Sequence, residues 1–258
     1  MSVLEKVWLD RTTVREDGKR VPTFWHPIPL SGDPDEVDMT LMAKLVALGL
    51  NLELPVGELI DTQIKRIRGL QTGLANQVLK AAVSDEGRHH RGMTYAQDWL
   101  EQHGVMVPTG FVNRWMADLE ALPYHPITVA ALLEVTLFLP FLALMRLKGG
   151  QAFNRLALGI NEDEQRHTVV NASLAAALKE PLPTCDRWLC LRDEILDWVL
   201  ADCEKDTRNL VITASDELFT DLDSPSLNRL NQVSAITFMA PFEVQNRQMY
   251  GRTLSENY

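Results

Sequence analysis

The motif Asp-Glu-x-x-His occurs twice in this chain, and it constrains the fold more than any other feature. It is present in Asp85–His89 ("DEGRH") and again in Asp163–His167 ("DEQRH"). A spacing of three residues places the Glu and the His on one face of an α-helix, less than one turn apart. If both motifs belong to one site, the chain must fold so that two helices turn these faces toward each other.

Apolar residues recur at the helical period over most of the chain, whereas alternation typical of strands never persists, so an all-α fold is expected. Four long helices are predicted at residues 36–68, 74–102, 127–147 and 151–179. Short loops join the first helix to the second and the third to the fourth, which predicts two antiparallel pairs. The long connection between the pairs, with a short helix near 111–122, is one way to complete a four-helix bundle.

The remaining segments are predicted from their composition and periodicity. Residues 1–35 are rich in Pro, Gly and charge and are expected to form an extended N-terminal arm or cap. Residues 36–258 are expected to form a single helical domain, with additional C-terminal helical regions at 186–219 and 226–252. The apolar stripe of the first helix keeps its phase through Pro55, which favours one kinked helix over two separate ones.

Composition excludes several classes of function. A net charge of -10 argues against nucleic-acid binding, since phosphate contacts need a basic face. Apolar and charged shares of 46% and 23% are those of an ordinary soluble protein. The N-terminus has no apolar run like a signal peptide. Three cysteines without CxxC spacing predict buried thiols in a reducing compartment, so we expect a cytoplasmic protein.

One segment, Ile127–Leu147, is long and apolar enough to cross a membrane. Glu134 lies inside it and Pro140 interrupts it, and a helix that is apolar all round also suits the centre of a bundle. We therefore expect a core helix, in which Glu134 is a buried carboxylate that needs a partner.

Glu134 is also expected to lie at the same depth in the bundle as the second motif. The turn Lys148–Gly150 stands almost midway between Glu134 and Glu164, so antiparallel packing of the third and fourth helices brings both carboxylates to a similar depth. The first helix offers Glu53 and Glu58. Glu53 lies within the apolar stripe, whereas Glu58 points away from it, so Glu53 is preferred and Glu58 remains the alternative.

The first motif leaves a second choice open. His90 lies closer to the centre of the apolar stripe than His89, but His89 repeats the spacing of the second motif and is preferred. Asp85 and Asp163 are expected to accept a proton from the imidazole of a ligand histidine and to fix its orientation. Arg88 and Arg166 either pair with these carboxylates or lie on exposed faces.

These choices give six candidate ligands and a catalytic centre with two metal ions. Hard carboxylate oxygens with imidazole suit iron or manganese, and four carboxylates balance the four positive charges of two divalent ions. The set consists of Glu53, Glu86, His89, Glu134, Glu164 and His167.

Over residues 36–179 these motifs make the chain similar to the ferritin-like di-iron carboxylate superfamily, and most of all to oxygenases of the p-aminobenzoate N-oxygenase type. The resemblance implies a ferritin-like four-helix bundle with a dinuclear centre of two iron ions, with manganese in place of one iron as a variant. It also implies O₂ as co-substrate, a small-molecule substrate for N-oxygenation or hydroxylation, and an external electron donor. The chain departs from those N-oxygenases at Ile160, where they carry an additional histidine ligand.

Two other functions remain as alternatives. The chain also resembles the small subunit of class I ribonucleotide reductase, but Met93 occupies the position of the radical tyrosine, and Tyr95 is turned away. A ferritin-like iron-storage protein is the non-catalytic alternative, although the arm and the C-terminal helices exceed a simple cage subunit. Those helices are candidates for a cap over the site or for a homodimer interface.

Overall fold

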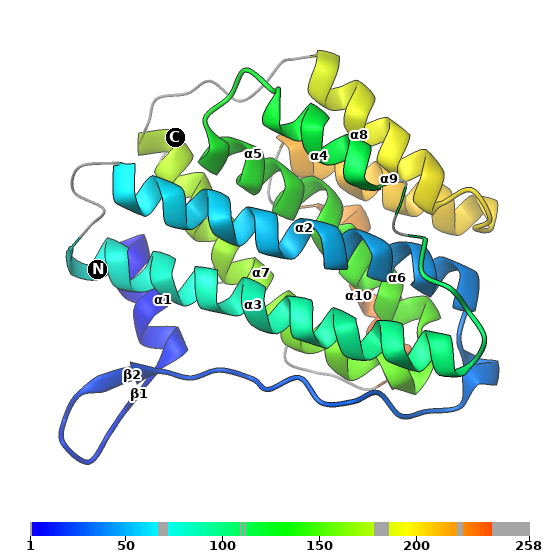
Figure 1. Ribbon diagram of the computed structural model, residues 1–258, viewed down its shortest axis with the longest axis horizontal. Helices are drawn as coiled ribbons and strands as arrows, with labels where there is room; N and C mark the ends of the chain where they lie inside the picture. Colours follow the sequence, from blue (N-terminus) through cyan, green and yellow to red (C-terminus); the bar gives the residue numbers. More distant parts are fainter. Residues whose placement is uncertain are drawn as a thin grey trace.

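The computed structural model describes residues 2–66, 72–108, 110, 112–177, 186–220 and 224–238. Within these ranges the chain is predominantly helical, which confirms the all-α fold class (Figure 1). The strands of the described part, β1 (Thr12–Val14) and β2 (Arg20–Pro22), form one small antiparallel hairpin in which Thr13 pairs with Val21.

Four long helical segments pack side by side and carry both motifs (Figure 1). They are α2 (Met39–Arg66), α3 (Gly73–Gln102), the continuous run of α5 (Pro126–Leu133), η3 (Glu134–Phe138) and α6 (Leu139–Lys148), and α7 (Gly150–Ala177). The segment α2 packs along α3 and against α5, while α7 packs against α3, α5 and α6. The predicted ranges therefore agree closely with the described helices. Residues 67, 68, 178 and 179 of those ranges lie outside the described residues.

Two prolines are accommodated differently in these helices. Pro55 lies inside α2, which continues through it as one helix, as predicted. Before Pro140, the chain adopts the π-helical turn η3, in which the N–H of Leu139 donates to the carbonyl of Glu134, five residues back. The sequence predicted one helix over residues 127–147 with an interruption at Pro140, but not the π-helical form of that interruption. Such wide turns are frequent at functional sites, and this one begins at Glu134.

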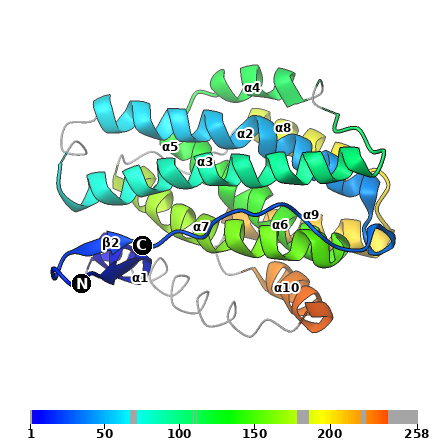
Figure 2. The same cartoon turned by 60° about the horizontal axis from the view of Figure 1, so that its bottom comes forward.

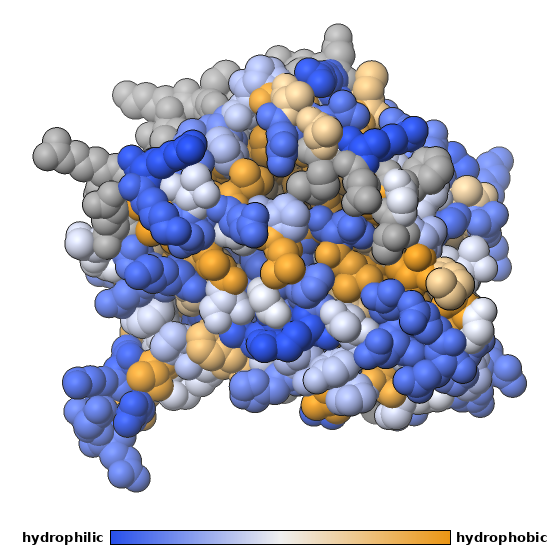
Figure 3. Space-filling view, in the orientation of Figure 1, coloured by the Kyte–Doolittle hydropathy of each residue, from blue (hydrophilic) through white to orange (hydrophobic). Residues whose placement is uncertain are grey.

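Within the described residues, two helices, Met39–Arg66 and Pro126–Lys148, are long and apolar enough to cross a membrane, but their apolar windows are 61% and 100% buried inside the fold. The face of the molecule seen in Figure 3 is mainly hydrophilic, with separate apolar areas between polar ones. Both helices therefore behave as core helices, which is compatible with a soluble protein.

The N-terminal arm is more structured than predicted. Residues Val3–Arg11 form α1, which begins with a capping box: the hydroxyl of Ser2 accepts from the N–H of Glu5 (3.2 Å), whose carboxylate accepts from the N–H of Ser2 (2.6 Å). The helix packs against α3 and α7. After the hairpin, the chain runs extended along the molecule before it reaches η1 (Pro34–Glu36) (Figure 2).

The remaining described helices pack against different sides of the four long segments (Figure 2). They are α4 (Val112–Glu120), α8 (Asp186–Val199), α9 (Lys205–Thr220) and α10 (Pro225–Phe238). The helical region predicted at 186–219 is confirmed, but it is divided: a turn after Leu200, where the N–H of Cys203 donates to the Leu200 carbonyl (3.1 Å), separates α8 from α9. The predicted helix beyond residue 238 lies outside the described residues.

The cysteines do not behave as predicted either. Cys190 is exposed and Cys203 is half-buried, and both are free thiols. The expectation of buried thiols is therefore wrong for Cys190, whereas Cys203 packs partly buried against the core in the turn between α8 and α9. Cys185 lies outside the described residues.

Candidate metal centre

All six candidate ligands lie together in the interior enclosed by the four long helical segments. Each has at most 2% of its surface exposed. The contributing elements are α2 with Glu53, α3 with Glu86 and His89, η3 with Glu134, and α7 with Glu164 and His167. Each element therefore brings at least one donor to the same buried point, as the helical phases required.

The donor atoms form two overlapping groups. Glu53, Glu86, His89 and Glu164 can each place one donor atom within 4.8 Å of the others, and so can Glu86, Glu134 and His167. Glu86 belongs to both groups.

Glu164 also faces both imidazoles. Its Oε1 lies 3.2 Å from Nδ1 of His89 and 3.7 Å from Nδ1 of His167. The two groups are therefore adjacent halves of one cluster.

The carboxylates of Glu86 and Glu164 are buried without hydrogen-bond partners at any of their four oxygens. Nδ1 of His167 approaches Glu86 Oε1 to 3.1 Å, yet this nitrogen also has no partner in hydrogen-bonding geometry. The closest basic groups to these carboxylates are the imidazoles of His89 and His167, and buried carboxylates persist where they are paired or coordinate a metal. The convergence of these atoms fits donors directed at a shared cation.

The charges of the cluster support the same conclusion. Burial raises the pKa of Glu53 and of Glu134 well above the usual range for a carboxyl group. Burial disfavours the charged form of His167, but the carboxylates of Glu86 and Glu164 together outweigh this effect and raise the His167 pKa to about 10. Glu53 likewise raises the pKa of His89, against its burial. The carboxylates thus stabilise positive charge on His89 and His167 inside the fold.

Each motif supports the histidine of the other motif. Nε2 of His89 lies 3.2 Å from Oδ2 of Asp163, and Nε2 of His167 lies 3.1 Å from Oδ2 of Asp85. An aspartate that accepts from Nε2–H fixes the ring and turns Nδ1 toward the glutamates, where Nδ1 of His89 lies 3.2 Å from Oε2 of Glu53. The supporting role expected for the two aspartates fits this geometry, and the crossed arrangement is an addition that the sequence did not reveal.

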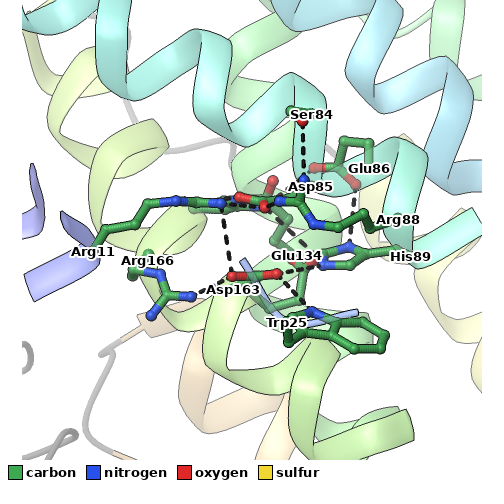
Figure 4. A network of polar contacts seen from close by, with 12 residues as sticks. Arg11, Trp25, Ser84, Asp85, Glu86, Arg88, His89, Glu134, Asp163 and Arg166 are labelled. Atoms are coloured by element: carbon green, nitrogen blue, oxygen red, sulfur yellow. Dashed lines mark hydrogen bonds and ion pairs between the residues drawn. The ribbon is translucent and has the colours of Figure 1, made fainter. Parts of the chain in front are cut away.

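A layer of cations and one indole surrounds the two aspartates (Figure 4). Arg88 forms an ion pair with Asp85, and Arg166 forms one with Asp163. Arg11, from α1, forms an ion pair with Asp85, and its Nη2 lies 3.9 Å from Oδ1 of Asp163. These contacts place the end of α1 directly behind the candidate ligands.

Trp25 completes this layer from the extended N-terminal stretch. Its Nε1–H donates to Oδ2 of Asp163 (2.8 Å), and its ring stacks beside that of His89 with 6.3 Å between centroids. The indole occupies space left by two glycines: a Cβ at Gly159 would lie 2.7 Å from it, and one at Gly92 would lie 3.3 Å from it. Both motif helices are thus shaped to admit this side chain.

A surface groove of about 280 Å³ lies on the outer side of Trp25. One wall is the extended stretch from Trp25 to Ser31, and the other is the first part of α7, from Gln151 to Leu156. The groove therefore reaches the same indole that contacts Asp163 on its inner side.

The alternatives left open by the sequence lie elsewhere. Glu58 is exposed, and His90 is half-buried and belongs to neither group of donors. A residue given no role in advance does reach the site: Nδ2 of Asn171 donates to both carboxylate oxygens of Glu134, at 2.9 Å each. Its position one turn after His167 on the same helical face was the available signal.

Comparison of the chain with protein-family models, with curated proteins and with solved structures finds no significant match. The site therefore has to be interpreted from its own residues.

Proposed function

We propose that this chain is a ferritin-like four-helix-bundle metalloprotein that binds two iron ions and uses O₂ to oxidise a small organic substrate. The observation that carries the proposal is the buried cluster in which Glu86 and Glu164, without hydrogen-bond partners, lie between two imidazoles. Such a donor set, Glu-x-x-His from two helices and one Glu from each of two others, is the one used for dinuclear carboxylate sites.

Charge balance supports two divalent ions rather than one. The four glutamates carry four negative charges when ionised, and their nearest basic groups are imidazoles that must be neutral to bind metal. The two supporting aspartates form ion pairs with arginines, Asp85 with Arg11 and Arg88, and Asp163 with Arg166. The inner cluster therefore keeps a charge that two divalent cations neutralise.

Each group of donors would hold one ion. Glu53, Glu86, His89 and Glu164 form the first group and Glu86, Glu134 and His167 the second, so Glu86 is common to both. These residues would hold two ferrous ions, which would supply two electrons for the reduction of O₂, and an external electron donor would replace them. Manganese in place of one iron would use the same donors.

The chain itself would orient the donors and exclude water. Asp163 and Asp85 hold the proton on Nε2 of the two histidines, so that Nδ1 of each stays available. Asn171 orients the carboxylate of Glu134 through both of its oxygens. The burial of all six donors keeps bulk water from the centre, as oxidation chemistry requires.

A small substrate would approach through the groove beside Trp25, because this groove leads from the surface toward the indole next to His89. Oxygenation of such a substrate, at carbon or at nitrogen, is the reaction we propose. We also propose a cytoplasmic location, and the C-terminal helices as the interface of a homodimer.

The radical-generating alternative is less well supported. Met93 is buried at the position where a radical tyrosine would stand, and Tyr95 is only half-buried. The iron-storage alternative has no observation of its own in its favour, since the same cluster would serve either purpose.

Aerobic turnover tests the proposal. The protein is loaded anaerobically with Fe(II), and O₂ is added with a reductant and a panel of small amines and aldehydes. Uptake of O₂ with an oxygenated product, lost in Glu164→Ala and kept in Glu58→Ala, would support the oxygenase. A persistent radical in electron paramagnetic resonance would instead support the reductase-like function, and many mineralised irons per chain would support storage.

A further inference from the structure

We propose that Arg11 is a positioning residue that holds both halves of the metal centre at once, through Asp85 to His167 and through Asp163 to His89. This inference rests on the proposed metal centre, and it makes the N-terminal helix α1 a part of that centre rather than a separate arm.

The geometry of Arg11 is that of a bridge between the two motifs. Its guanidinium is paired with Asp85 on α3 and lies 3.9 Å from Asp163 on α7. Those two aspartates face the Nε2 atoms of histidines on the opposite helices, at 3.1 and 3.2 Å. One side chain therefore stands behind both imidazoles, each time with a single carboxylate between.

Burial holds Arg11 in this position. Only 3% of its surface is exposed, although it lies at the last residue of a short helix near the N-terminus. The ring of Phe24 lies 5.0 Å from its guanidinium carbon and 3.8 Å from that of Arg88. A planar guanidinium with several donors suits two carboxylates in different directions, which a compact ammonium does not.

The two neighbouring arginines provide matched controls, since each makes an ion pair with one aspartate. Arg88 pairs with Asp85, and Arg166 pairs with Asp163. If Arg11 couples the halves, its loss should disturb both histidines, whereas loss of either neighbour should chiefly disturb one.

Nuclear magnetic resonance of protein labelled with ¹⁵N-histidine resolves the two halves. The Nε2–H protons of His89 and His167, each hydrogen-bonded to an aspartate, are observed in the metal-free and in the Zn(II)-loaded protein. Arg11→Gln is expected to shift or broaden both signals, Arg88→Gln mainly that of His167, and Arg166→Gln mainly that of His89. Competition with a chelator should show Zn(II) affinity about 10–100-fold weaker at both positions in Arg11→Gln.

The outcomes separate clearly. Unchanged signals in Arg11→Gln, or a change confined to one histidine, would overturn the coupling. If Arg11→Gln does not fold, Arg11→Lys keeps the charge and is expected to disturb at least one signal; two unchanged signals would refute the proposal. Failure of the unaltered protein to bind Zn(II) would count against the metal centre, while the signals of the metal-free protein would still test Arg11.

Discussion

The pH dependence of the metal-free protein tests the charges of the site directly. The pKa of His167 is raised from 6.5 to about 10, because Glu86 and Glu164 stabilise its charged form against the effect of burial. A histidine with a raised pKa in the folded protein contributes stability that is fully present below pH 6.5 and is lost as the pH rises toward 10. The metal-free protein should therefore become less stable above neutral pH.

The size of this effect follows from the two pKa values. Between pH 6 and pH 9, His167 alone would lower the free energy of unfolding by about 3 kcal/mol. His89, whose pKa is also raised, acts in the same direction. In a chain of this size a change of about 3 kcal/mol corresponds to a fall in Tm of roughly 6–12 °C.

The assay is unfolding by urea and by heat in the presence of a chelator at pH 6, 7.5 and 9. His167→Gln should flatten the dependence, while His26→Gln, at an exposed position, should leave it unchanged. The affinity of the protein for Zn(II) should instead rise from pH 6 to pH 9, because the histidines must lose protons to bind the metal. A metal-free stability that stays level or rises from pH 6 to pH 9 would refute the reasoning.

Two substitutions test individual residues against matched controls. Glu86→Ala removes the carboxylate common to both donor groups and should reduce bound metal below one ion per chain, whereas Glu58→Ala should bind normally; equal metal content would contradict the assignment. Gly159→Ala places a Cβ 2.7 Å from Trp25 and should lower the free energy of unfolding by about 1–3 kcal/mol, with altered indole fluorescence. Gly87→Ala, with open space around its Cβ, should instead raise the free energy of unfolding by up to about 1 kcal/mol. Similar effects of the two substitutions would contradict the close packing of Trp25 against Gly159.

The ligand cluster could be anticipated because helical phase and chemical type point to the same residues. Glu53 was preferred over Glu58 from its place in the apolar stripe, and only Glu53 is buried in the cluster. Helical phase alone favoured His90 over His89, and this was wrong. Because α3 packs against α1, α2 and α7, the buried face of α3 is broader than the single apolar stripe seen in the sequence. The repeat of the second motif favoured His89, whose Nδ1 lies 3.2 Å from carboxylate oxygens of Glu53 and Glu164.

The surroundings of the cluster could not be anticipated in the same way. The hydrogen bonds from the aspartate of each motif to the histidine of the other depend on how α3 and α7 face each other. The spacing of residues within one helix does not predict this. Arg11 and Trp25 lie in a segment whose prolines and charges suggested an extended arm, although Ser2 and Glu5 carry the spacing of a capping box. Their contacts join residues far apart in the chain, and these form only in the folded protein.

X-ray diffraction from crystals loaded anaerobically with Fe(II), measured across the iron absorption edge, tests the central claim most directly. The account predicts two anomalous peaks per chain, one among Glu53, His89 and Glu164 and the other between Glu134 and His167, with Glu86 contacting both. A single peak, an empty cluster or iron bound only elsewhere on the chain would contradict it.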